Sequence, residues 1–501
     1  MKLVNLSIAA AAACLFATSA HALKTEDRIL QGNNQVQYIK SPGDVNSLTE
    51  MFTKGDVYGR LRSNAFLWEW ENESGSVKDN DMWGLGGSLI AKTGFYNGFG
   101  ATVGFYGTTQ LLDDNTIAGS TTNFGKAGKD TYRTRADGTE ADIGVFAEAF
   151  LEYKAGKTDV KVGRQGIDSI MLATNDTKMV PNTFEAAVIE NSDIPNTTLR
   201  AGYIISQKLR DHQVFHSVIA YDPTSKVEEN DDSGVHKGLR TDLIRSRGNG
   251  DVDPEMILLT AENTSIPNLK LNGEYVGLKG FFSTAIAEAN YKIKLNDAWT
   301  VTPGIRYLSQ MDDGAGFIGG AAISGSLRTN TTSGTTGYKD VRNVDGSIIM
   351  ARLVADSGPL KLGVGYSKVS DDADIIAPWR GFPTGGYTRS MAQVDWIANT
   401  RNWAVQAAYD FDKAGLVPGM KVAADYESMN FDDSKAFISG FTDRNIFHVD
   451  VWQTFKAVPN TEFKFRFATI DADTAYTAAT VQSSVDNNSY NEYRFEINYL
   501  F

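Results

Sequence analysis

Cysteine is almost absent from this sequence, whose 501 residues contain only Cys14. With a single thiol the chain cannot form an internal disulfide, so covalent cross-links are excluded as a source of its stability. Cys14 itself lies in an apolar N-terminal stretch that we expect to be removed. A secreted protein of this length must then be held together by core packing or by closure of a sheet.

Long hydrophobic runs are also missing after the first 22 residues. No later stretch approaches the roughly 18 consecutive apolar residues of a membrane-spanning helix. The mean hydropathy is −0.27, as in soluble proteins. A transmembrane β-barrel has a similar average, because each lipid-facing residue of a strand is followed by a lumen-facing one. The composition therefore excludes a helical membrane protein and leaves a barrel open.

Histidine is scarce, and the five present suit neither of the usual hydrolytic sites. His21 lies in the segment that we expect to be removed, and His212, His216, His236 and His448 form no recognisable triad. The spacing His212-Gln-Val-Phe-His216 lacks the glutamate of a zinc-protease motif. An enzyme is therefore not expected, although a hydrolase carried on a barrel stays an alternative.

The net charge of −13 argues against nucleic acid as a partner. Acidic clusters occur at Asp231-Asp232, Asp312-Asp313 and Asp371-Asp372-Ala-Asp374, and their carboxylate oxygens could hold Ca²⁺. Solvated loop tips, or cations that bridge the surface to lipopolysaccharide, explain these clusters equally well. No cofactor is expected, with loop-bound Ca²⁺ as the alternative.

The first 22 residues have the three parts of a secretory signal peptide. They contain Lys2, an apolar stretch over 8–17 and Ala20-His-Ala22, after which we expect cleavage. Ala11 stands where a lipoprotein signal would have leucine, so lipid attachment at Cys14 is not expected. We predict a signal peptide at 1–22, a periplasmic extension at 23–55 that includes Ser47-Leu-Thr-Glu-Met-Phe52, and a barrel at 56–501.

The last nine residues alternate strictly between two faces. Tyr493, Phe495, Ile497, Tyr499 and Phe501 fall on one face, and polar residues fall on most of the other. A soluble sandwich could contain such a strand, but a C-terminal strand that ends in phenylalanine is similar to the assembly signal of outer-membrane barrels. The alternation recurs upstream and predicts eighteen strands, near 57–70, 84–92, 99–110, 143–153, 158–165, 184–190, 197–207, 256–262, 268–279, 282–294, 299–309, 347–355, 360–369, 402–411, 419–428, 446–455, 461–470 and 493–501.

The connections between these strands alternate in length, as in a bacterial barrel with short periplasmic turns and longer outer loops. Tight links rich in turn residues include 154–157, 191–196, 263–268, 356–359 and 457–460. Long polar stretches lie near 111–141, 208–255, 311–345, 370–401 and 471–490, and the very short outer link at Gly280 is an exception. We therefore predict an all-β fold, a transmembrane antiparallel barrel wide enough to enclose an aqueous channel.

Strand parity directs a set of basic side chains into the lumen. Closure makes the first strand and the last two strands neighbours, so one positive strip is expected from Arg60, Arg62, Lys464, Arg466 and Arg494. Arg200, Arg306 and Arg352 point inward by the same rule. With carboxylates opposite, such a strip would create a transverse field that attracts anions. The alternative is that any water-filled lumen needs polar residues.

The connection near 166–183 is more apolar than a solvated surface loop should be. We expect it to fold into the barrel and narrow the pore, with Asp168, Asp176 and Lys178 as the charged residues of the constriction. Alternatively, it packs only against neighbouring loops or against a trimer partner.

Two patches of the sequence resemble OprD-type outer-membrane porins. Gly163-Arg-Gln165, followed by Asn175-Asp-Thr-Lys-Met-Val-Pro-Asn-Thr-Phe184, resembles the signature of that family. Asn402-Trp-Ala-Val-Gln-Ala-Ala-Tyr-Asp-Phe411, Gly415-Leu-Val-Pro-Gly419 and Val422-Ala-Ala-Asp-Tyr426 are similar to its late hairpin. Elsewhere the likeness is one of order and spacing. Similar major outer-membrane porins occur in the Campylobacter group.

The resemblance implies an eighteen-stranded porin with one lumen per monomer, often trimeric. It also implies an inward third loop, a ladder of wall arginines and a preference for small carboxylate-bearing solutes. The chain departs from the family where Lys178-Met-Val-Pro-Asn182 replaces Arg-Leu-Leu-Pro-Gln, which keeps the charge but loses a bidentate grip on carboxylates. Arg164 shares parity with the lipid-facing Val160 and Val162, so either the strand is bulged there or Arg164 lies beyond the bilayer.

Together these inferences favour a multi-pass porin in the outer membrane of a Gram-negative bacterium, through which small hydrophilic solutes diffuse passively. Its expected partners are those solutes, outer-membrane lipid and lipopolysaccharide. A surface adhesin or structural barrel with a blocked lumen is the main alternative. A gated transporter with an energised partner is disfavoured, because 23–55 is too short for a plug domain.

Overall fold

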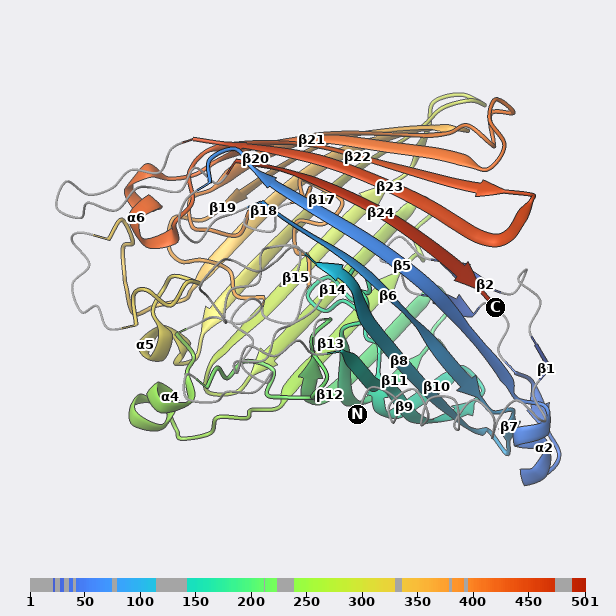
Figure 1. The fold of residues 1–501 in the computed structure, drawn as a ribbon. Helices are drawn as coiled ribbons and strands as arrows, with labels where there is room; N and C mark the ends of the chain where they lie inside the picture. The colour runs from blue at the N-terminus through green and yellow to red at the C-terminus, as the bar shows by residue number, and fades with distance from the viewer. Residues whose placement is uncertain are drawn as a thin grey trace.

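Eighteen long strands form one closed antiparallel barrel (Figure 1). The computed structural model describes residues 21–22, 28–30, 36–38, 42–73, 79–113, 142–210, 212–222, 238–328, 336–377, 381–391, 395–473 and 489–501. The barrel strands are β5 (Asp56–Trp70), β6 (Asn80–Lys92), β8 (Phe99–Asp113), β9 (Ile143–Ala155), β10 (Thr158–Gln165), β11 (Thr183–Asn191), β12 (Thr197–Lys208), β13 (Met256–Asn263), β14 (Leu269–Leu278), β15 (Phe282–Tyr291), β17 (Thr300–Asp312), β18 (Gly346–Ser357), β19 (Leu360–Val369), β20 (Arg401–Asp410), β21 (Met420–Asn430), β22 (Arg444–Phe455), β23 (Val458–Ala472) and β24 (Tyr490–Leu500).

The barrel is closed by the first and last of these strands. β24 pairs antiparallel with β5, from Tyr490 opposite Trp70 to Leu500 opposite Arg60. The ladder continues one step further, because Gly59 and Phe501 exchange backbone hydrogen bonds of 3.0 and 3.1 Å. Closure leaves no unpaired edge in the barrel wall, which a sheet surrounded by lipid requires.

Short strands and helices lie at the two ends of the barrel. The short strands are β1 (His21–Ala22), β2 (Arg28–Leu30), β3 (Val36–Tyr38), β4 (Asp44–Val45), β7 (Phe95–Tyr96) and β16 (Ile293–Lys294). The helices are α2 (Leu48–Thr53), α4 (Thr241–Arg247), α5 (Ala315–Gly319) and α6 (Ala436–Ser439), with a 3-10 turn η3 (Asp433–Lys435). Within the described ranges, no helix is long and apolar enough to cross a membrane. Apart from His21–Ala22, the predicted signal peptide lies outside those ranges.

The two ends of the barrel differ in the length of their connections, and we name them the turn end and the loop end. α2 and β7 lie at the turn end, whereas α4, α5 and α6 lie at the loop end (Figure 1). Two turns repeat the motif Ile-Pro-Asn, in which Asn196 and Asn268 adopt positive φ values of 56° and 66°. Asparagine tolerates this left-handed conformation, which lets the chain reverse directly into the next strand at each of the two turns.

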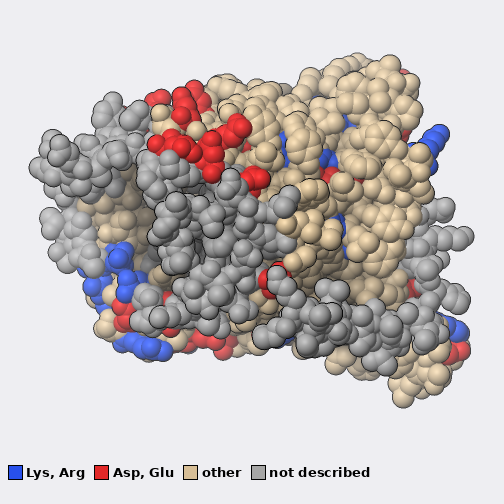
Figure 2. Space-filling model, in the orientation of Figure 1, with Lys and Arg blue, Asp and Glu red and all other residues tan. Residues whose placement is uncertain are grey.

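Strand residues alternate between an outward and an inward face. In β24, Phe495, Ile497 and Tyr499 are exposed on the outside, whereas Arg494 and Glu496 are buried inside. The visible outer face shows a broad uncharged area, and carboxylates gather toward its loop end (Figure 2). Such an apolar band is what a barrel wall in lipid requires.

All eighteen predicted strands are confirmed, with start and end points within four residues of those expected. The largest difference is in β6, which begins at Asn80 rather than at residue 84. The tight link predicted at 457–460 is present but shorter and earlier, because β22 ends at Phe455 and β23 begins at Val458, and the register between the two strands shifts between Thr454 and Phe455. The exception at Gly280 is present as expected, with only three residues between β14 and β15.

Candidate functional site in the barrel lumen

The connection 166–182, between β10 and β11, is mostly buried. Met171, Leu172, Met179 and Val180 are fully buried. On one side the connection is held by Glu274 of β14, whose carboxylate accepts hydrogen bonds of 2.8 to 2.9 Å from Ser169 Oγ and from the backbone N–H groups of residues 170 and 171. The strand register places Glu274 on the inward face of the wall, so this loop lies inside the barrel.

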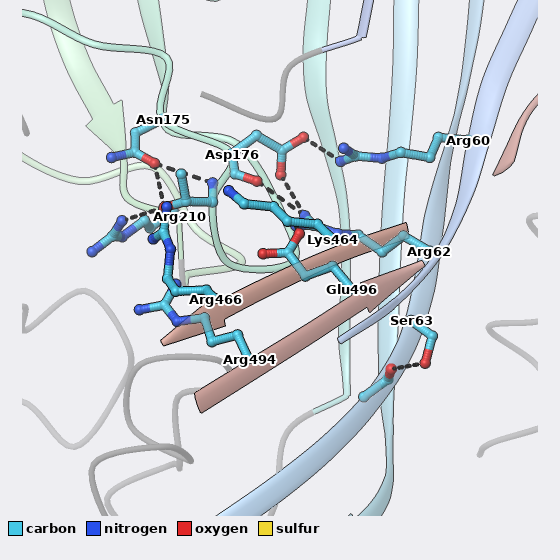
Figure 3. A network of polar contacts seen from close by, with 12 residues as sticks. Arg60, Arg62, Ser63, Asn175, Asp176, Arg210, Lys464, Arg466, Arg494 and Glu496 are labelled. Carbon is cyan, nitrogen blue, oxygen red and sulfur yellow. Dashed lines mark hydrogen bonds and ion pairs between the residues drawn. The ribbon is translucent and has the colours of Figure 1, made fainter. Parts of the chain in front are cut away.

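On its other side the loop is tied to β5 through Asp176 (Figure 3). Arg60 Nη2 lies 2.5 Å from Asp176 Oδ2, and Arg62 Nη1 lies 3.0 Å from Asp176 Oδ1. Arg62 Nη1 also donates to the backbone carbonyl of Asp176, and its Nη2 lies 3.3 Å from Glu496 Oε2 on β24. All four side chains are at most 2 % exposed. Because buried charges are tolerated only when paired, these contacts fix where the loop meets the wall.

Lys178 contacts the same stretch of wall. Its Nζ lies 4.7 Å from the centroid of the Phe66 ring, and the guanidinium of Arg494 lies 4.0 Å from that centroid. Cations are attracted to the face of an aromatic ring. The structure therefore brings Asp176 and Lys178 of the predicted constriction against the closing strands.

Asp168, the third residue expected in the constriction, lies apart from the other two. Its side chain is exposed, and its Oδ1 accepts from the backbone N–H of Thr174 at 2.8 Å. Its backbone carbonyl accepts from Arg200 Nη1 at 2.9 Å, and Arg200 also pairs with Glu190 at 3.0 Å. Arg200 therefore anchors the start of the loop to β12.

The rest of the predicted basic strip comes together on β23 and β24. Arg466 and Arg494 are directly opposite each other in the ladder, and Lys464 is opposite Glu496. Like charges at opposed positions destabilise a sheet unless they are neutralised. On β22, Asp450 Oδ1 and Oδ2 accept hydrogen bonds from Arg466 Nε and Nη2, each at 2.6 Å. Asp450 Oδ2 also lies 3.2 Å from Lys464 Nζ.

Carboxylates therefore interleave with the cations of the strip. Asp176 and Asp450 each contact two of its members, Glu496 contacts Arg62, and Glu492 lies within ion-pair distance of Arg494. The sequence analysis expected the carboxylates on the opposite side of the lumen, but these four lie among the cations. The wall is thus a row of alternating charges in place of a purely positive surface.

A second group of wall arginines holds a second inward loop. Arg306 forms an ion pair with Glu288, and its Nη1 also donates to the backbone carbonyl of Pro383. Arg352 Nη1 donates to the carbonyl of Gly386 at 3.0 Å. Both guanidinium groups lie over the ring of Tyr387, 4.7 and 4.5 Å from its centroid.

The described parts of the connection 370–400, residues 370–377, 381–391 and 395–400, therefore fold into the lumen as well. The sequence analysis placed this connection among the long outer loops and did not predict that it folds inward. Its Phe382 N–H donates to the carbonyl of Ile170 at 3.0 Å, so the two inward loops touch each other. Burial raises the pKa of Asp395 to about 6 and lowers the pKa of Arg389 to about 10.

Four loops share one apolar core at the loop end of the barrel. It combines buried residues of 166–182, 209–255, 313–345 and 370–400 with inward strand residues, and its loop members include Leu172, Val218, Ile244, Leu327 and Ile376. Apolar side chains in these connections explain why they pack inward.

Sequence reasoning missed His448, which lies within the charged row. Its Nδ1 is 2.7 Å from Asp425 Oδ2, and its Nε2 is 3.2 Å from Asp450 Oδ1. Strand parity could have found it, because His448 shares an inward face with Asp450 on β22. It was set aside only because it joined no catalytic triad.

Arg164 stays in the regular ladder of β10, opposite Ala149 and Glu185. Its Nε lies 2.8 Å from Glu185 Oε1, and its guanidinium lies 4.3 Å from the centroid of Phe215 in the loop that follows β12. These partners place Arg164 at the loop end of the strand, apart from the strip.

In the acidic clusters that the structure describes, the carboxylates accept hydrogen bonds from groups of the protein itself. Asp312 accepts from the N–H groups of Gly314 and Val344, and Asp374 accepts from Ala398 N–H at 2.9 Å. Asp231-Asp232 lies outside the described residues. Among the residues that the structure describes, no group of three or more histidine, cysteine or acidic side chains could hold a metal ion.

A family model described as outer membrane porin, OprD family, matches residues 56–501. Similar solved structures include OccK9 (OpdG) of Pseudomonas aeruginosa, 18% identical with a TM-score of 0.65, covering 89% of this chain and 98% of that one. OccAB3 of Acinetobacter baumannii is 16% identical with a TM-score of 0.67, covering 89% and 99%. A BenF-like porin from Pseudomonas fluorescens Pf-5 is 18% identical with a TM-score of 0.65, covering 89% and 98%. No curated protein sequence matches the chain.

Proposed function

The chain belongs to the OprD family of outer-membrane porins, and from this premise we propose that it conducts small hydrophilic solutes passively, with a preference for those that carry a carboxylate. A porin of this family is a channel in the outer membrane of a Gram-negative bacterium. The observation that supports the finer proposal is the charged row on β5, β23 and β24. Its cations would attract an anionic solute, and its carboxylates would limit how tightly that solute is held.

The proposed roles of the residues follow from their contacts. Asp176 and Lys178, on the inward loop, would set the width of the constriction beside Arg60 and Arg62. Partly exposed members of the wall would meet the passing solute: the Arg466 side chain is 14% exposed, and the Arg200 side chain is 28% exposed. Arg306 and Arg352 would act indirectly, by holding the second inward loop.

Planar bilayer recording of the purified protein tests the proposal. We expect stepwise currents, and a reversal potential in a salt gradient that shows anion preference. The double variant Arg466→Ala/Arg494→Ala should reduce that preference. A matched control is Lys368→Ala/Arg401→Ala, which removes the same charge from two opposed, exposed positions on the outer face of β19 and β20. Equal reversal potentials in the two double variants would overturn the role of the charged row.

Solute preference needs a direct comparison. Liposome swelling with a small monocarboxylate, a neutral polyol and an amine of similar size should show the fastest entry for the monocarboxylate. Equal rates for the three would leave a general porin and remove the proposed preference.

The apolar core of packed loops favours a second candidate, a barrel whose lumen is blocked and whose loops bind other molecules. Family membership supports a channel over this alternative. The two differ in bilayer recordings, since a blocked barrel would give no stepwise current at any applied potential.

We also propose a homotrimer, as the resemblance to the family implies. The outer wall of β12 to β15 carries small side chains, including Ala201, Ala261, Gly273 and Ala287, which would permit close approach of a second barrel wall. Mass measurement of the detergent-solubilised protein should give three chains per particle. A single chain per particle would contradict this proposal.

A further inference from the structure

The short helix α2 (Leu48–Thr53), which precedes the first barrel strand, is fixed at both of its ends. Ser47 Oγ accepts from Glu50 N–H at 3.2 Å, and Glu50 Oε2 accepts from Asn46 N–H at 2.8 Å. The first bond caps the helix by satisfying an N–H group that a helix start leaves free, and the second ties Glu50 back to the residue before the cap. At the other end, Gly94 N–H donates to the carbonyl of Met51 at 2.8 Å. A helix of six residues is too short to persist alone, so these contacts define its orientation.

The side chains of α2 divide into an apolar half and a polar half. Leu48 and Phe52, one turn apart, lie on the apolar half and are 65% and 57% exposed. On the polar half, Lys54 Nζ forms an ion pair with Glu50 Oε1 at 2.9 Å. When a helix exposes two large apolar side chains on one face, that face is typically covered by something apolar, such as lipid.

The helix lies at the level of an aromatic pair on the outer wall. Its bond to Gly94 ties it to the turn that leads into β8, and β8 begins with Phe99. The Phe99 and Tyr153 rings face outward, with centroids 4.6 Å apart. Aromatic side chains gather where a barrel wall leaves the hydrocarbon and meets the headgroups. α2 therefore sits beside one boundary of the membrane, next to β7 at the turn end (Figure 1).

A shallow groove joins α2 to the lipid-facing wall. It is lined by Phe52 together with Val57, Ala91, Ala101 and Val103. Val57 is opposite Ala91, and Ala91 is opposite Val103, so these three side chains form one row on the outward face. The groove is thus continuous with the surface that the membrane already covers.

We propose that α2 is an interfacial membrane anchor, whose Leu48 and Phe52 insert among the acyl chains of glycerophospholipids in the leaflet at the turn end. One acyl chain lies in the groove between Phe52 and the outward row of Val57, Ala91 and Val103. The polar half, with Glu50 and Lys54, faces the headgroups and water. In this arrangement the last segment before the barrel, residues 48–53, is held on the bilayer surface.

Spin labels on single cysteines can test the anchor in the full chain. The only native cysteine is Cys14, so Cys14→Ala gives a cysteine-free background. Leu48→Cys and Phe52→Cys place a label on the apolar half, and Thr49→Cys and Thr53→Cys place matched labels on the polar half of the same helix. Phe99→Cys serves as the lipid-facing reference. Each labelled protein is reconstituted into phosphatidylethanolamine and phosphatidylglycerol vesicles, and its folding is checked by heat-modifiable gel mobility.

Power-saturation electron paramagnetic resonance then compares access of oxygen, which concentrates in acyl chains, with access of a water-soluble nickel chelate. Labels at positions 48 and 52 should resemble the label at 99, with more oxygen than nickel contact, whereas labels at 49 and 53 should show the reverse. Nickel contact at 48 and 52 equal to that at 49 and 53 would overturn the proposal in favour of a helix in water. Low contact with both reagents at 48 and 52 would also overturn it, since protein would then cover the apolar half.

Discussion

Asp176 and Arg62 are joined by two contacts, one to the carboxylate and one to the backbone carbonyl of the same residue, each 3.0 Å from Arg62 Nη1. The two residues are 114 positions apart in the sequence. Because Arg62 belongs to the regular ladder of β5, this double contact fixes the backbone of an irregular loop relative to a rigid wall. Arg60, two residues earlier on the same face, binds the second carboxylate oxygen.

The first prediction concerns this attachment. Asp176→Asn keeps the size of the side chain but removes the charge that both guanidinium groups contact. Breaking one partner of a buried ion network commonly costs about 3 to 5 kcal/mol, enough to release a loop from its wall. We expect larger and noisier single-channel conductance, and faster amide hydrogen exchange across 170–180.

Asp193→Asn is the control for this substitution, because it removes a carboxylate that is exposed at the turn end. It should leave conductance and exchange unchanged. If Asp176→Asn gave the conductance and noise of the unmodified protein, Asp176 would not determine the width of the pore.

The second prediction separates the charges within the row. Asp450→Asn removes the carboxylate that neutralises Arg466 and Lys464, so the permeability ratio of anion to cation should rise. Arg466→Ala should lower the ratio. A single charge beside a water-filled path contributes on the order of 1 kcal/mol, or about fivefold in that ratio. Reversal potentials in a potassium chloride gradient give both ratios, and shifts in the same direction for the two variants would contradict an electrostatic role.

The sequence predicted which side chains face inward but not which of them neutralise each other. Parity is a local property of a strand, and it places Arg494 and Glu496 on one face without reference to any other strand. Pairing of Lys464 with Asp450 depends on the register between β22 and β23, which is set by the whole sheet and by the turn between them. The extra turn residues expected at 457–460 show that this register could not be obtained from sequence alone.

Loop positions were predictable only in part, for a related physical reason. The segment 166–182 was expected to fold inward because it is more apolar than a solvated surface loop should be. In 370–400 the apolar residues, such as Ile375, Ile376 and Trp396, lie in short groups within a long polar stretch, and its inward position depends on Arg306 and Arg352 of distant strands. Contacts with residues far away in the sequence depend on the folded structure, and the composition of the loop itself does not reveal them.

The third prediction tests how that second loop is held. Tyr387→Leu keeps an apolar side chain but removes the ring that Arg306 and Arg352 both cover, with a loss of about 1 to 2 kcal/mol. We expect faster cleavage by added protease within 381–391 and faster amide exchange there. Tyr366→Leu, on the outer face of β19, removes an exposed ring and should leave the loop protected. Equal protection in both variants would mean that hydrogen bonds alone hold the loop.

The fourth prediction concerns Asp374, which joins two loops at the loop end. Its carboxylate accepts from Tyr338 Oη and Ala398 N–H at 2.8 and 2.9 Å, and from Ile323 N–H at 2.8 Å. Burial raises the pKa of Asp374 from 3.8 to about 6, and the hydrogen bonds only partly oppose this effect. The folded loops therefore bind a proton more readily than the unfolded chain does.

It follows that the stability contributed by protonated Asp374 is fully present below pH 3.8 and is lost as the pH rises through about 6. Over that window the loss amounts to about 3 kcal/mol at most. Amide exchange at Ile323 and Ala398, corrected for the intrinsic pH dependence, should be slower at pH 4.5 than at pH 7.5. Asp374→Asn, which cannot ionise, should remove the difference, while the amide of Asn399, bonded to the Ser370 carbonyl, reports any general change. Greater protection at pH 7.5 would instead show that the ionised carboxylate, with its three donors, is the form that holds the two loops together.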